Sequence, residues 1–89
     1  MSIGISFDKV DRIKRELRTL LPNVKSSHRT EAMARGLGFA TNAGLRVALG
    51  EGLTHCLIHP ERFKEYLAEH GFAVSAEDLI TATIKAGDA

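Results

Sequence analysis

Length, composition and charge narrow the classes of protein to which this chain can belong. It has 89 residues, of which 44 % are hydrophobic, and a formal net charge of +1. A chain of this length forms one domain around a single core, and its one cysteine, Cys56, excludes an intramolecular disulfide framework. No apolar run approaches the roughly 18 residues that span a bilayer, and no signal-peptide pattern is present. We therefore expect one cytoplasmic domain, residues 1–89, without membrane association.

The charged residues are unevenly distributed along the chain. Residues 1–52 carry nine Lys or Arg against five Asp or Glu, a balance of +4. Residues 53–89 carry three against six, a balance of −3. Such polarity can attract a partner of either charge, or a second copy of the chain in a homodimer. The same uneven distribution of charge would also be found if both halves of the chain were simply solvated and bound no partner.

Apolar residues at three- and four-residue steps predict an all-α fold, a bundle of about five short helices. The first runs from about residue 7 to 21, with Ser6 as N-cap and Pro22 ending it. The second begins after Ser26 and Ser27, either of which can cap its free amides, and ends at Gly38.

The remaining helices follow from similar signals. Thr41 is expected to cap a third helix over residues 42–49, and Pro60 to occupy the first position of a fourth that Gly71 closes. Residues 75–78 resemble a capping box with Asp78 in place of Glu, at the start of a fifth helix. Residues 53–58 are apolar, but a lone strand would have no partner within the chain, so we expect a loop there.

The most distinctive sequence motif is the segment SHRTEAMARGLGF at residues 27–39. It resembles a short helical module of uncharacterised bacterial proteins, which also occurs as the glyoxalase-related segment attached to some glyoxalase-superfamily proteins. The segment HPERFKEYLAEHGF at 59–72 resembles the downstream part of the short proteins. The resemblance covers about a third to a half of the chain. It implies a helical fold and no activity, because 89 residues are too few for the paired βαβββ modules of the enzymes.

The same segment fits a helix-turn-helix template across residues 28–49. Counted from Thr30, the small residue Ala34 falls at position five and Gly38 at position nine, where the turn needs a positive φ. Four apolar residues would close the angle between the two helices: Met33, Leu37, Phe39 and Val47. Helical bundles that do not bind DNA also satisfy this template by chance.

A DNA-reading second helix needs polar side chains toward the base edges. Asn42 and Arg46 share one helix face, and Thr41 is placed to bond a phosphate. Cations elsewhere would add backbone contacts, although Arg12, Arg15 and Arg18 at three-residue steps are equally typical of the solvent face of a helix. The sequence pI of about 8.0 lies below the value of about 9 that is typical of DNA-binding domains.

The histidines and the cysteine do not follow the spacing of a known metal or catalytic site. His55, Cys56 and His59 lie close in sequence, but Pro60 biases His59 toward extended geometry, and no second ligand pair has zinc-site spacing. Neighbouring residues of an extended segment point to opposite sides, so His55 cannot activate Cys56. We expect no enzymatic activity, no metal and no cofactor.

The leading hypothesis is a small regulator or inhibitor that docks on a protein partner. The resemblance suggests plasmid- or phage-encoded relatives, which fits a mobile-element inhibitor of the anti-CRISPR kind. The alternative is a helix-turn-helix DNA-binding transcriptional regulator. Both hypotheses draw on the same candidate partner-binding residues: Arg12, Arg15, Arg18, Lys25, Arg29, Arg35, Thr41, Asn42 and Arg46.

Overall fold

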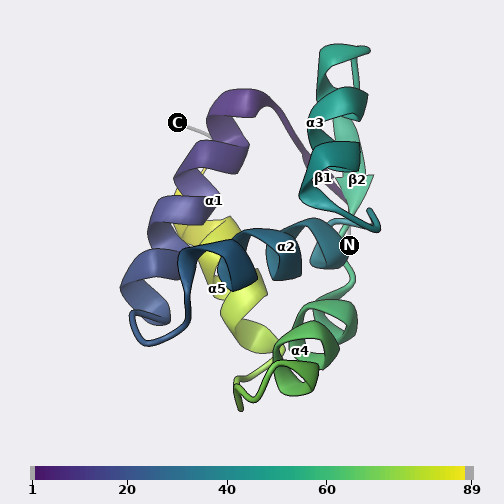
Figure 1. Cartoon of the computed structure of the whole chain (residues 1–89). Helices are drawn as coiled ribbons and strands as arrows, with labels where there is room; N and C mark the ends of the chain where they lie inside the picture. Colours follow the sequence, from purple (N-terminus) through teal and green to yellow (C-terminus); the bar gives the residue numbers. More distant parts are fainter. Residues whose placement is uncertain (1, 88–89) are drawn as a thin grey trace.

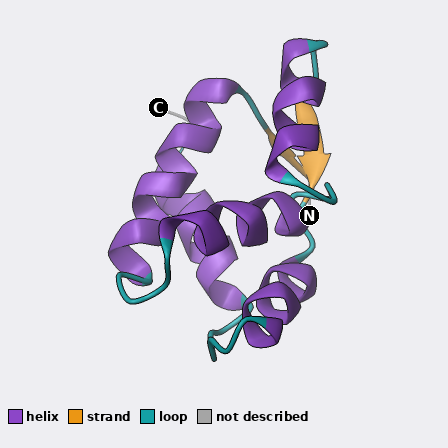
Figure 2. Ribbon diagram, in the orientation of Figure 1, coloured by secondary structure: helices purple, strands orange, loops and turns teal. Residues whose placement is uncertain are grey.

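Helices make up most of the chain in the computed structural model, which describes residues 2–87 (Figure 2). Within these residues there are five helices and two short strands. Their order is β1 (Ser2–Gly4), α1 (Phe7–Leu20), α2 (Ser26–Gly36), α3 (Asn42–Gly50), β2 (His55–Leu57), α4 (Pro60–Glu69) and α5 (Glu77–Ala86). The predicted helical fold is confirmed. None of the helices in this range is long and apolar enough to cross a membrane.

The helices pack as two main pairs, α1 against α5 and α2 against α4 (Figure 1). Helix α3 and the strands lie together at one end of the molecule (Figure 1). The fully buried large side chains come from all five helices and the turn after α2: Val10, Ile13, Leu17, Met33, Leu37, Leu45, Phe63, Leu67 and Leu79. Lys9 is also buried, and its ammonium donates to the carbonyl of Gly87 at 2.6 Å, which joins the start of α1 to the end of α5.

Most of the predicted helix ends are confirmed. The Ser6 hydroxyl accepts from the amide of Lys9 at 3.0 Å, and the Thr41 hydroxyl accepts from the amide of Gly44 at 3.0 Å. Gly38 and Gly71 follow α2 and α4 with φ of 95° and 87°, the left-handed geometry that a glycine adopts without strain.

Two predicted caps differ from the structure. Ser26 and Ser27 lie inside the first turn of α2, and Lys25 occupies the N-cap position without a side-chain bond. The helix begins one residue early because the Lys25 carbonyl already accepts from the amide of Arg29 at 2.9 Å. Before α5, the Asp78 carboxylate accepts from the amide of Ser75 as predicted, but the Ser75 hydroxyl bonds the amide of Glu77 instead of the amide of Asp78.

The loop predicted for residues 53–58 is wrong. Residues 55–57 form β2, which pairs antiparallel with β1 in the register Ser2↔Leu57, Ile3↔Cys56 and Gly4↔His55. The amide of Ile5 extends this ladder to the carbonyl of Thr54 at 2.9 Å. The prediction failed because it did not consider the first residues of the chain, which supply the partner strand.

A turn at Gly38 joins α2 to α3, and one of the apolar positions predicted for this pair of helices is misassigned. Met33, Ala34 and Leu37 are buried as expected. Val47 is not, because 59 % of its side chain is exposed. The buried face of α3 instead carries Leu45, with Leu49 one turn later, which leaves Val47 on the opposite side.

Gly36 ends α2 where that helix passes closest to α4 and α5. A Cβ atom here would lie 3.1 Å from the Cβ of Phe63 and would collide with a terminal methyl of Leu79. Both neighbours are fully buried, so little space is available to relieve the overlap. The Gly36 carbonyl accepts from the amide of His59 at 2.6 Å, which joins α2 to the residue before α4. The packing of three helices therefore requires glycine at this position.

We expect Gly36→Ala to lower the free energy of unfolding by about 1–3 kcal/mol, because the added methyl overpacks the core. Gly50→Ala is the matched control, since Gly50 also ends a helix and its Cβ would meet no atom within 4 Å. That variant should be neutral or stabilised by up to about 1 kcal/mol. Urea denaturation followed by circular dichroism measures both values. Equal stabilities of the two variants would contradict the close approach at Gly36.

Candidate functional site

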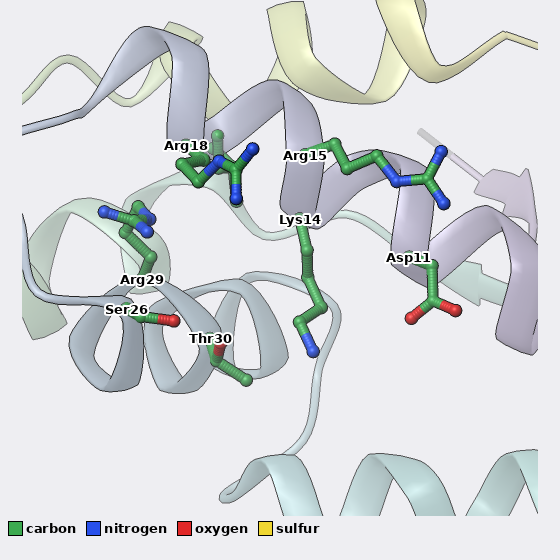
Figure 3. Close-up of a pocket in the computed structure, with 8 residues that line it drawn as sticks. Asp11, Lys14, Arg15, Arg18, Ser26, Arg29 and Thr30 are labelled. Carbon is green, nitrogen blue, oxygen red and sulfur yellow. The ribbon is translucent and has the colours of Figure 1, made fainter.

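A groove with a cavity volume of about 270 Å³ lies between α1 and α2 (Figure 3). We call it the basic groove and define it by six side chains: Lys14, Arg15 and Arg18 of α1, and Ser26, Arg29 and Thr30 of α2. The buried side chain of Leu17 also lines it, and Asp11 adds one carboxylate. The groove combines four cations with one acid and two hydroxyls.

Helical periodicity gathers these residues on one side of the molecule. Lys14 and Arg18 are one turn apart on α1, as are Ser26 and Thr30 on α2. Figure 3 shows Lys14 extending from α1 toward the side of α2 that carries Thr30. Arg18 and Arg29 lie at one end of the groove, and Arg15 lies with Asp11 at the other (Figure 3). The polar side chains that line the groove thus come from two helices that face each other.

Most of the positive charge in the basic groove is not neutralised within the described chain. Among residues 2–87, the one ion pair joins Arg12 to Asp8 at 2.9 Å, outside the groove. Over the same range, the side chains of Lys14, Arg15 and Arg18 make no ion pair. Helix α2 also begins there without an acidic residue in its first turn and without a side-chain cap, so the positive end of its dipole is unopposed.

Arg29 differs from the other cations because its guanidinium is engaged in the fold. One of its terminal nitrogens donates to the carbonyl of Leu21 at 3.2 Å and to that of Val24. Both carbonyls belong to the loop between α1 and α2. Arg29 therefore fixes this loop, and with it the spacing of the two helices, while its charge still faces the groove.

The structure brings three of the nine predicted partner-binding residues together in the basic groove: Arg15, Arg18 and Arg29. Arg12 is paired with Asp8, and the Arg35 side chain donates to the carbonyl of Ala40 at 2.7 Å. Lys25 is exposed at the start of α2. Lys14 completes the cluster and was not among the predicted residues.

The three residues predicted to face DNA bases or phosphates surround the start of α3. Thr41 uses its hydroxyl as the helix cap, and the amide of Asn42 donates to the Glu31 carboxylate at 2.9 Å. The Arg46 guanidinium lies 5.4 Å from the ring centre of Phe7, within the range of a cation–π interaction. The Thr41 and Arg46 side chains therefore make intramolecular contacts, whereas Asn42 makes its contact through the backbone amide.

Sequence reasoning missed an aromatic cluster between α2 and α4. The ring of His28 lies 4.6 Å from that of His70 and 5.6 Å from that of Phe72, and its Nδ1 is buried without a hydrogen-bond partner in the described residues. Tyr66 completes the cluster, with its ring centre 4.3 Å from that of His70. The Arg35 guanidinium lies over the Tyr66 ring, 5.3 Å from its centre. No local pattern in the sequence signals this cluster, because His28 lies on α2 whereas Tyr66, His70 and Phe72 lie on or just after α4.

The remaining histidines and the cysteine do not form a site with each other. His55 is exposed and bonds the Thr54 hydroxyl at 3.0 Å, whereas Cys56 is half-buried. Burial raises the pKa of the Cys56 thiol above its ordinary value. Within residues 2–87, no three His, Cys, Asp or Glu side chains come together in a group that could hold a metal ion.

Comparison with protein-family models, curated proteins and solved structures finds no match to this chain.

Replacing Arg29 should reveal its structural role. We expect Arg29→Met to lower the free energy of unfolding by about 1–3 kcal/mol, because two loop carbonyls lose a charged donor. The control Arg18→Met removes the same charge from an exposed side chain and should change stability by no more than about 0.5 kcal/mol. Thermal denaturation of both variants provides the comparison. If Arg18→Met proved the more damaging of the two, our assignment of Arg29 to the loop would be wrong.

Alkylation of Cys56 should be slow in the folded protein. The raised pKa means a smaller thiolate fraction at a given pH, so the folded protein's rate–pH profile should lie at higher pH than that of the unfolded chain. Iodoacetamide labelling in buffer and in urea, followed by mass spectrometry, measures both profiles on the one cysteine of the sequence. Superimposable profiles would show that the fold does not protect this thiol.

Proposed function

We propose that this protein is a non-enzymatic binding protein that docks through its basic groove on a negatively charged surface of a partner protein. The observation that carries the proposal is the set of cations in the groove. Lys14, Arg15 and Arg18 gather on one side of α1 without an acidic partner in the described chain. Clustered like charges destabilise a fold, so their concentration at a groove is best explained by a ligand of opposite charge.

A binding role is also favoured by the composition of the groove. The four histidines and the cysteine, which are the side chains best suited to catalysis near neutral pH, are not among its lining residues. The cations instead supply charge and hydrogen-bond donors on rigid helices. Such a surface gives fast, electrostatically steered association and selects partners by charge.

DNA binding through the α2–α3 pair is the second candidate. The turn at Gly38 and the cap at Thr41 support it, because both are features of a helix-turn-helix. The exposed side of α3 argues the other way, since it presents Ala43, Gly44 and Val47. Arg46 is the one cation on this helix, whereas the unpaired cations are on α1. A protein partner that binds the groove would use the unpaired cations of α1, which a DNA contact through α3 would leave unexplained.

The resemblance of segments 27–39 and 59–72 to plasmid- and phage-associated helical proteins supports a narrower proposal. A small inhibitor encoded by a mobile element, of the anti-CRISPR kind, acts by occupying a charged surface of a host protein. By charge complementarity, the basic groove would suit an acidic surface of such a host protein. We propose that the protein acts as a regulator or inhibitor at such an acidic surface.

Charge reversal in the groove tests the docking proposal. We expect Arg15→Glu/Arg18→Glu to weaken association with the partner by about tenfold or more, because attraction becomes repulsion at the contact. The control Arg62→Glu/Lys64→Glu makes the same change in net charge on exposed residues of α4 and should retain binding. Wild type and both variants are immobilised, exposed to bacterial lysate with and without nuclease, and compared by quantitative mass spectrometry.

Two results would contradict the docking proposal. Equal capture by the groove variant and the wild type would show that these cations do not contact the partner. Loss of the captured species after nuclease treatment would assign the binding to nucleic acid and favour the helix-turn-helix candidate. A captured protein that survives nuclease and is lost only in the groove variant is the expected outcome.

A further inference from the structure

The size of the basic groove limits what it can hold. Pockets for drug-sized ligands and cofactors have volumes of roughly 300–1,000 Å³. At about 270 Å³, the groove lies just below the small end of this range, and seven of its eight lining residues have charged or hydroxyl side chains. A single anionic group that projects from a larger molecule fits these dimensions better than a whole cofactor.

The donors in the groove outnumber the acceptors of a carboxylate. Lys14 offers three N–H groups and Arg18 five, and the hydroxyls of Ser26 and Thr30 add two more. A carboxylate has two oxygens and one negative charge. A phosphate monoester has three terminal oxygens and a charge of about −1.5 to −2 at neutral pH, so it uses more donors and gains more from several cations.

The groove is also held in place before a ligand arrives. Arg29 bonds two carbonyls of the loop that connects α1 to α2, the two helices that line the groove. Leu17 is completely buried beneath the polar side chains, so the floor of the groove is part of the core. Preorganised donors bind an anion without the cost of ordering the two helices first.

We infer that the basic groove is a binding site for a phosphate monoester, carried by a phosphorylated side chain of the partner protein. This inference rests on the proposed function, because it specifies the negatively charged group to which the groove docks. Lys14 and Arg18 contact the phosphate oxygens, and Ser26 and Thr30 donate to them from the opposite helix. Arg15 lies at the other end of the groove, where it meets acidic residues next to the phosphorylated position.

The test is a titration of the full-length ¹⁵N-labelled protein with N-acetyl-phosphoserine amide, followed by amide chemical shifts. We expect saturable shifts at Ser26 and Thr30, and none with N-acetyl-serine amide. Lys14→Gln/Arg18→Gln should weaken the affinity about tenfold, since two charge-assisted contacts are lost. The control Arg62→Gln/Lys64→Gln removes the same charge from α4 and should bind like the wild type. Inorganic phosphate serves as the free-ion probe.

The pH dependence identifies the charge state that is recognised. The second proton of a phosphate monoester leaves with a pKa of about 6, so its affinity should rise between pH 5 and 7.5 as the dianion forms. Sulfate provides the reference for any change in the protein itself over this pH range. Sulfate keeps its charge over this range, and the ratio of the two affinities removes the contribution of the protein's own groups.

Four outcomes would overturn the inference. The first is an absence of shifts at Ser26 and Thr30 with phosphoserine amide. The second is equal affinity in the Lys14→Gln/Arg18→Gln variant. The third is binding of inorganic phosphate without binding of the phosphoserine amide, which would make the groove a free-anion site. The fourth is binding of dimethyl phosphate or a short DNA duplex as tightly as the monoester, which would indicate a nucleic-acid backbone.

The inference and the docking proposal fail separately. If Arg15→Glu/Arg18→Glu abolishes capture of the partner while phosphoserine amide does not bind, docking stands and the contacted groups are carboxylates. If phosphoserine amide binds in the groove and capture is unchanged by the reversal, the site for phosphate is present but is not where the partner docks.

Discussion

The close passage of α2 over α4 and α5 at Gly36 is the constraint on which the rest of the structure depends. Phe63 and Leu79 fill the space that any side chain would need, and the Gly36 carbonyl receives the amide that precedes α4. This one position holds the last turn of α2 against both helices. The first turns of the same helix supply Ser26, Arg29 and Thr30 to the basic groove between α1 and α2. The two ends of α2 therefore serve packing and the candidate site respectively.

The groove shows how a small domain divides cations between stability and recognition. Arg12 and Arg29 each have a partner within the fold, one a carboxylate and the other loop carbonyls. Lys14, Arg15 and Arg18 belong to the same stretch of chain but gain no such partner in the described residues. Because spacing along a helix places side chains on a face without specifying their contacts, a sequence cannot separate these two groups. The separation depends on where the loop carbonyls and the second helix lie.

Local sequence signals predicted the helices, but they did not predict contacts between segments that are far apart in the sequence. Ser6, Thr41, Gly38 and Gly71 act through bonds to residues a few positions away, so their roles could be inferred from the sequence. The pairing of β1 with β2 joins two segments that are separated in the sequence by three helices, and each strand alone is too short to be recognised from its sequence. The aromatic cluster around His28 was missed for the same reason, since its members lie on α2 and near the end of α4. Of the candidate site, Arg15, Arg18 and Arg29 were predicted, whereas Lys14 and the convergence with Ser26 and Thr30 were not.

The strand pair also bears on the order in which the molecule assembles. Residues 2–4 meet residues 55–57 only after the chain between them has been brought back on itself, and closing a long loop costs entropy that a few ladder bonds do not repay. Packing of α1, α2 and α3 must reduce that distance first. Residues 2–4 therefore gain their native partner strand only once the intervening helices have brought residues 55–57 close to them.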